Sequence, residues 1–187
     1  MIGDGPLGGF RVAARKITDI RLSADSVREI LGVGSTPQDL DFGELLDHLT
    51  VKYGITYDVL DEADMPHWDV EACWDPESVT MYIRSDVFVK VCQGDPRAKF
   101  TIVHELGHGL LGHRRTINRT STQRKPEVFE DSEWQANQFA AEFLMPLNVI
   151  QAHKLRTATE VERHFKVSPP AAVKRVKQLQ SRGELPC

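Results

Sequence analysis

Residues 104–108 read His-Glu-Leu-Gly-His, a combination that can hold a metal ion and activate water. On a helix, each residue advances about 100° around the axis, so His104 and His108 lie about 40° apart on one face. Zinc binds imidazole nitrogens at about 2.0–2.1 Å, and catalytic zinc sites keep a fourth position for water. Glu105 lies one residue round the helix, where it can reach that water and act as a general base.

The residues that flank this motif predict a half-buried helix. Asp95 can cap its start, Pro96 suits its first turn, and Gly112 can end it. Gly107 and Gly109 each weaken a helix by about 1 kcal/mol relative to alanine, which indicates that another backbone approaches closely. The alternative, two surface histidines on an ordinary amphipathic helix, is disfavoured because two half-buried histidines without a partner would be costly. The apolar stripe beside the histidines comprises Phe100, Val103, Gly107, Leu110 and Leu111.

A catalytic zinc ion needs one more protein ligand, and His113 is not expected to supply it. His113 is nine residues after His104, about 180° round a continued helix, so it should face away from the metal. We interpret it as a helix C-terminal residue whose partial positive charge suits the helix dipole.

A second helix is predicted within residues 131–146, with Asp131 or Ser132 as its cap. One face carries Glu133, Asn137 and small residues, which allow close packing against the glycine-bearing helix. Glu133 would then complete a two-histidine, one-glutamate zinc site. The side-chain oxygen of Asn137 would accept a hydrogen bond from a ligand imidazole and fix its tautomer. A first-turn glutamate is also favoured by the helix dipole alone. The competing acids are Glu130 and Glu142.

The chain resembles the ImmA/IrrE family of zinc metallopeptidases, most strongly over residues 99–146. This resemblance implies that His104, His108 and Glu133 bind zinc and that Glu105 is the base. It also implies a substrate, because family members are linked to site-specific cleavage of helix-turn-helix repressors that control stress or mobile-element genes. The matching residues are Phe100-Thr101-Ile102-Val103-His104-Glu105-Leu106-Gly107-His108, then Glu133, Ala136-Asn137, Phe139-Ala140-Ala141 and Leu144-Met145-Pro146.

Charge is unevenly distributed along the 187 residues, although the formal net charge of −4 gives no global nucleic-acid signal. Residues 39–77 hold twelve acids against Lys52 alone, whereas residues 114–125 carry five cations and no acid. The simple interpretation is solvated faces and a mobile loop. The sharper interpretation is a docking surface that steers a charged partner to the active site.

Cysteine use and hydropathy predict a cytoplasmic protein. The three cysteines, Cys73, Cys92 and Cys187, are too few and too scattered for a disulfide framework or a cysteine zinc cluster. No signal peptide is apparent, and no apolar stretch approaches membrane-spanning length.

The predicted fold class is α+β and zincin-like, mainly helical with a small three-stranded, mostly antiparallel sheet. Strands are predicted at residues 55–60, 70–74 and 79–83, and 79–83 is nominated as the edge strand that holds the substrate backbone beside the metal. The expected organisation is a flexible N-terminus at 1–20, a metallopeptidase domain at 21–155 and a helix-turn-helix-like element at 156–187.

This C-terminal element comprises two predicted helices around the turn Lys166-Val167-Ser168. Lys174, Arg175 and Lys177 make it basic, so DNA contact is one interpretation. The favoured interpretation is packing or protein docking, because related helix pairs commonly serve those purposes.

The sequence therefore predicts a zinc-dependent endopeptidase, with manganese as an alternative metal, that cleaves a repressor encoded nearby. Zinc would acidify a water and polarise the scissile carbonyl, while Glu105 would take the water's proton and pass it to the leaving amine. The alternative is a non-proteolytic DNA- or repressor-binding regulator with a structural metal site. No membrane partner is expected. Unranked candidates for an oxyanion donor are Tyr82, Arg97 and His153.

Overall fold

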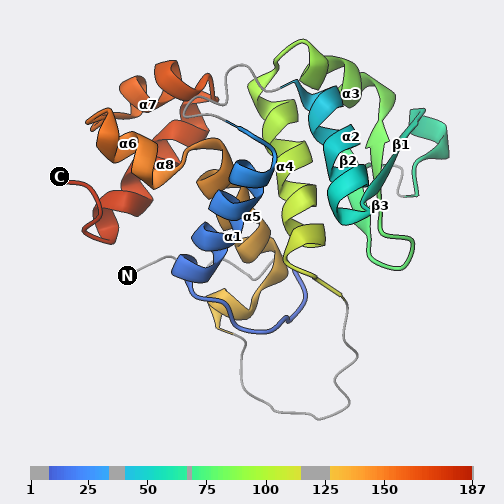
Figure 1. Ribbon diagram of the computed structural model, residues 1–187, viewed down its shortest axis with the longest axis horizontal. Helices are drawn as coiled ribbons and strands as arrows, with labels where there is room; N and C mark the ends of the chain where they lie inside the picture. The colour runs from blue at the N-terminus through green and yellow to red at the C-terminus, as the bar shows by residue number, and fades with distance from the viewer. Residues whose placement is uncertain (1–8, 34–40, 67–68, 115–126, 187) are drawn as a thin grey trace.

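The computed structural model describes residues 9–33, 41–66, 69–114 and 127–186. Helices α4 (Pro96–Leu110) and α5 (Ser132–Leu144) pack against each other, and α1 (Ile17–Ile30) packs against α5. Figure 1 shows α4 and α5 at the centre, with a small sheet on one side and helices α6, α7 and α8 on the other. The predicted fold class is confirmed. The other helices are α2 (Phe42–Tyr53), α3 (Ser85–Cys92), α6 (Leu147–Ala152), α7 (Ala158–Phe165) and α8 (Pro169–Ser181), with short 3-10 helices η2 (Glu62–Asp64) and η3 (Val128–Glu130).

The sheet contains β1 (Thr56–Leu60), β2 (Ala72–Asp75) and β3 (Thr80–Arg84) in the order β1-β3-β2. It is mixed, because β1 pairs with β3 in parallel and β2 pairs with β3 antiparallel. The nomination of residues 79–83 as an edge strand is therefore wrong, since β3 is flanked on both sides. The edge strand that contacts α4 is β2.

The ends and the glycines of α4 follow from local chemistry. The Asp95 carboxylate accepts a hydrogen bond from the Ala98 N–H at 2.8 Å, which satisfies a free donor of the first turn. A Cβ at Gly107 would lie 3.2 Å from the Cα of Ala136, tighter than ordinary van der Waals contact, so any larger residue there would push α5 slightly away. At Gly109 the neighbour is the Trp74 ring rather than a backbone.

The N-terminal segment packs beside the start of α5. The Val12 N–H donates to the Glu130 carbonyl at 2.8 Å, and the Ser132 N–H donates to the Phe10 carbonyl at 3.1 Å. The sequence predicted a flexible terminus at residues 1–20. Residues 1–8 lie outside the described part, but residues 9–16 are held against the start of α5 by these hydrogen bonds. Residue 20 itself lies inside α1.

A buried ion cluster joins α1, α5 and α8. Both terminal nitrogens of Arg175 donate to the Glu142 carboxylate, at 2.8 and 2.6 Å, and Arg21 donates to the same carboxylate at 3.0 Å. Arg175 is 1% exposed, so it cannot contact DNA as the sequence suggested, whereas Lys174 and Lys177 are exposed. The hydrophobic core continues past residue 155 into α7 and α8.

Within the described residues, no helix is long and apolar enough to cross a lipid bilayer. The basic segment at residues 114–125, for which a docking surface was one interpretation, lies outside the described part except for Arg114.

Candidate metal centre

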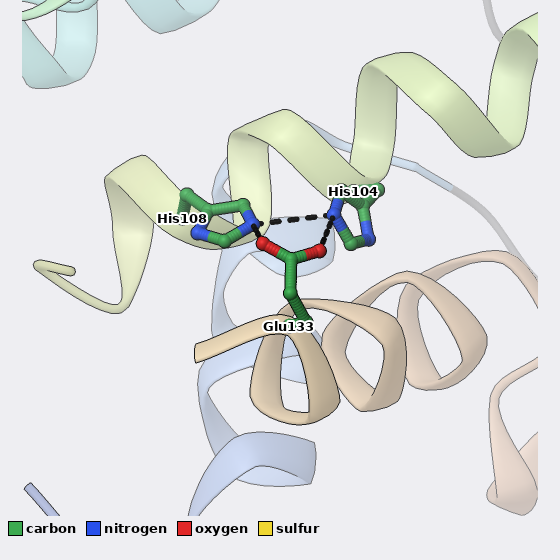
Figure 2. A group of neighbouring side chains, drawn as sticks. All are labelled: His104, His108 and Glu133. Carbon is green, nitrogen blue, oxygen red and sulfur yellow. Dashed lines mark hydrogen bonds and ion pairs between the residues drawn. The ribbon is translucent and has the colours of Figure 1, made fainter. Parts of the chain in front are cut away.

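Three side chains from α4 and α5 converge on one point. Figure 2 shows the Glu133 carboxylate between the two imidazoles, with Oε2 3.1 Å from His104 Nε2 and Oε1 3.2 Å from His108 Nε2. The two Nε2 atoms are 3.2 Å apart. Ligand atoms around a tetrahedral zinc ion, with bonds of about 2.0–2.1 Å, are separated by roughly 3.3 Å. The spacing of the three donor atoms therefore fits one zinc ion.

A hydrogen-bond chain behind His108 indicates which of its two ring nitrogens carries a hydrogen. Gln135 Nε2 donates to the carbonyl oxygens of Ala13 and Phe129, both at 2.8 Å, so the Gln135 side-chain oxygen faces His113. That oxygen lies 3.0 Å from His113 Nε2, which must therefore carry a hydrogen. Neutral His113 then accepts at Nδ1, 3.1 Å from His108 Nδ1. His108 therefore donates through Nδ1, and in its neutral form it presents an unprotonated Nε2 to Glu133.

His113 is neutral because burial lowers its pKa to about 4, and only 2% of the residue is exposed. The interpretation of His113 as a partly charged helix-end residue is therefore wrong. The helix ends at Leu110, and Gly112, with a φ of +68°, reverses the chain so that the His113 N–H donates to the His108 carbonyl at 2.9 Å. The prediction from the sequence assumed that α4 continues to residue 113, and that assumption placed the His113 imidazole on the side away from His108.

The resulting donor set is the kind that a cation stabilises. A hydrogen bond with His104 holds the pKa of Glu133 well below its ordinary value, so Glu133 is a carboxylate. In neutral His108 the Nε2 lone pair faces a carboxylate oxygen of Glu133, and two such acceptors repel unless a positive charge lies between them. Two imidazole nitrogens and a carboxylate suit zinc, which would take the place of the hydrogen that His104 shares with Glu133.

Glu105 lies beside this group and is held by the sheet edge. Its Oε2 accepts a hydrogen bond from the Trp74 N–H of β2 at 2.9 Å, and its Oε1 lies 4.0 Å from His104 Nε2. Burial raises the pKa of Glu105, which brings it nearer to the value that suits a base working near neutral pH. Sequence reasoning missed Trp74, although the glycine at 109, one turn after Glu105, was a signal that something bulky packs there.

Asn137 makes a different contact from the one expected. Its Nδ2 donates to the Glu133 carbonyl at 2.7 Å, while the contact to the His108 imidazole comes from His113. The competing acids belong to other interactions, Glu130 with Arg11 and Glu142 with Arg175. Among the oxyanion candidates, Arg97 pairs with Glu71 and His153 lies beside His164.

Replacing His113 with Phe should weaken zinc binding about 10–100-fold, because His108 would lose the partner that fixes its tautomer. A competition titration against a chromophoric chelator measures this directly. The matched control is His48→Phe, which changes an exposed histidine of α2 and should bind zinc as the wild type does. Equal zinc affinities in the two variants would contradict the role assigned to His113.

Comparisons with known proteins agree with this geometry. Residues 50–177 match the peptidase family described as the IrrE N-terminal-like domain. Among solved structures, a Mycobacterium tuberculosis transcriptional regulator is similar, with a TM-score of 0.52 and 17% identity. The likeness covers 83% of this chain but 45% of the regulator, so it spans about half of that longer protein and shows the fold alone. No curated protein matches this chain.

Proposed function

Since the chain belongs to the IrrE N-terminal-like family of peptidases, we propose that it is a zinc-dependent endopeptidase with His104, His108 and Glu133 as metal ligands. The observation that carries the proposal is the convergence of these three side chains with a fourth, Glu105, held beside them. A structural zinc site has four protein ligands, whereas the described residues offer three. A three-ligand site suits catalysis.

The chain's own residues would move the proton. Bound zinc supplies Lewis acidity, which lowers the pKa of water and polarises a carbonyl group. Glu105 would take a proton from the attacking water and deliver it to the leaving amine. The Trp74 N–H fixes one oxygen of the Glu105 carboxylate, which leaves the other oxygen for proton transfer. Burial raises the pKa of Glu105, which makes its carboxylate a stronger base than an exposed glutamate.

The edge strand β2 would align the substrate. It contacts α4, and its Trp74 N–H points away from β3 toward Glu105. An extended peptide can pair with an edge strand through main-chain hydrogen bonds, which brings its backbone beside the catalytic residues. We therefore assign to β2 the role that the sequence suggested for residues 79–83.

The substrate that we propose is a helix-turn-helix repressor encoded near this chain, cleaved in the cytoplasm to release stress or mobile-element genes. The resemblance to the ImmA/IrrE family motivates this choice. The name of the M. tuberculosis protein, transcriptional regulator, supports a role in gene control.

Incubation of the chain with the neighbouring repressor and zinc should produce one defined cut, mapped by mass spectrometry, while casein stays intact. Removal of the metal with a chelator should stop cleavage, and zinc or manganese should restore it, because catalysis depends on the metal. A tight complex with an intact repressor would instead favour the non-proteolytic regulator.

A further inference from the structure

A pocket of about 340 Å³ lies between α4, α5 and α8, one helical turn from the proposed active site. Thr101 lines it and lies four residues before Glu105, and Asn137 lines it four residues after Glu133. Residues four apart on a helix are neighbours on one face. The hydrogen bond from Asn137 Nδ2 to the Glu133 carbonyl links the pocket wall to the turn of α5 that carries Glu133, a proposed metal ligand. One helical turn is about 5.4 Å, a distance that a large side chain of a substrate bound at the metal can span.

The lining combines apolar surface with one cation, Lys174, for which the described residues provide no partner. Two of its cations are paired, Arg97 with Glu71 at 3.0 Å and Arg175 with Glu142 at 2.6 Å. Lys174 is exposed and has neither an ion pair nor a hydrogen bond within the described part of the chain. The apolar lining residues are Phe100, Ala141, Met145, Pro170 and Ala171.

We infer that this pocket is a specificity subsite for a large apolar substrate side chain that has an acidic residue next to it. The inference rests on the proposed peptidase function. The pocket's volume is at the lower end of the roughly 300–1,000 Å³ of small-molecule sites, which suits a side chain better than a large cofactor. Apolar contacts select the buried side chain, and Lys174 attracts the neighbouring carboxylate.

This assignment gives α8 a purpose different from DNA reading. Arg175 of α8 is engaged in the buried ion pair with Glu142. Ala171 and Lys174, on the same helix, form one wall of the pocket. The ion pair with Glu142 ties this wall to α5, the helix that carries Glu133. The C-terminal helix pair therefore positions a substrate contact relative to the metal centre.

The test uses the full-length protein with zinc and the neighbouring repressor, once its cut site is mapped. Ala171→Trp fills the pocket and should slow cleavage about 10-fold or more. Lys174→Glu should slow it similarly, and cleavage should recover when the acidic residue near the cut is changed to Lys. Matched controls are Val173→Trp and Lys177→Glu, which alter exposed residues of α8 outside the pocket lining and should cut as the wild type does.

The outcomes separate the two proposals. If the wild type cuts the repressor but neither Ala171→Trp nor Lys174→Glu changes the rate, the subsite is refuted and the peptidase stands. If no charge swap in the repressor rescues Lys174→Glu, the acidic preference is refuted. If the wild type cuts no better than Glu105→Gln, the proposed peptidase function is refuted. The subsite is then refuted as well, because it depends on that function. Because Lys174 is exposed, its variant keeps the test valid even if Ala171→Trp unfolds.

Discussion

Glu105→Gln should bind zinc as the wild type does and should reduce repressor cleavage by about 10²–10⁴-fold, the usual contribution of a general base. Gln is nearly isosteric and can still accept the hydrogen bond from the Trp74 N–H, so the side chain should stay in place. It cannot take a proton from water. Single-turnover cleavage of the repressor, with zinc content measured on the same sample, separates loss of the base from loss of the metal.

The control for this variant is Glu77→Gln, which removes the same charge from an exposed acid near the end of β2. It should cut the repressor at the wild-type rate. Normal cleavage by Glu105→Gln would show that another group serves as the base, and the mechanism proposed for Glu105 would then be wrong.

Glu142→Leu should destabilise the protein by about 3–5 kcal/mol, because it leaves the Arg175 guanidinium buried without its carboxylate partner. Arg175 is 1% exposed and Glu142 is 0% exposed, so solvent cannot compensate. Within the described residues, the variant would leave Arg175 a hydrogen bond to the Met145 carbonyl at 3.0 Å, while Arg21 would keep its ion pair with Glu184. Urea unfolding followed by circular dichroism gives the change in the free energy of unfolding.

The double variant Glu142→Leu/Arg175→Met should recover most of that loss, because it removes both buried charges.

Burial alone would raise the pKa of Glu142, but hydrogen bonds and charge from Arg175 and Arg21 outweigh it and lower the pKa. The stabilisation is therefore complete above the ordinary glutamate pKa and is lost as pH falls. The double variant should lose less stability on acidification. A loss below about 1 kcal/mol in Glu142→Leu would place the pair among weak surface bridges instead.

Local features of α4 and α5 could be predicted because short-range chemistry determines them. Caps at Asp95 and Asp131 begin the two helices as expected. The family resemblance is confirmed by the match over residues 50–177. The structure also brings Glu133 to the two histidines, as the spacing suggested, and the assignment of these residues as metal ligands remains a prediction.

Features that depend on chain reversal or on distant pairing could not be predicted. The role of His113 depends on the helix stopping at Leu110 and on the left-handed turn at Gly112, so a continued helical projection misplaced it. The central place of β3 depends on its pairing with β1, across more than twenty residues of chain. The sequence suggests that Arg175 is a surface cation, because its buried partner Glu142 lies on another helix and cannot be identified from local spacing.

A crystal structure with anomalous diffraction measured at the zinc absorption edge tests the central assignment most directly. We expect one zinc peak per chain, at about 2.0–2.2 Å from His104 Nε2, His108 Nε2 and a Glu133 carboxylate oxygen, with a solvent oxygen as the remaining ligand. A zinc ion bound elsewhere, or one enclosed by four protein ligands, would contradict a catalytic metal centre in this protein.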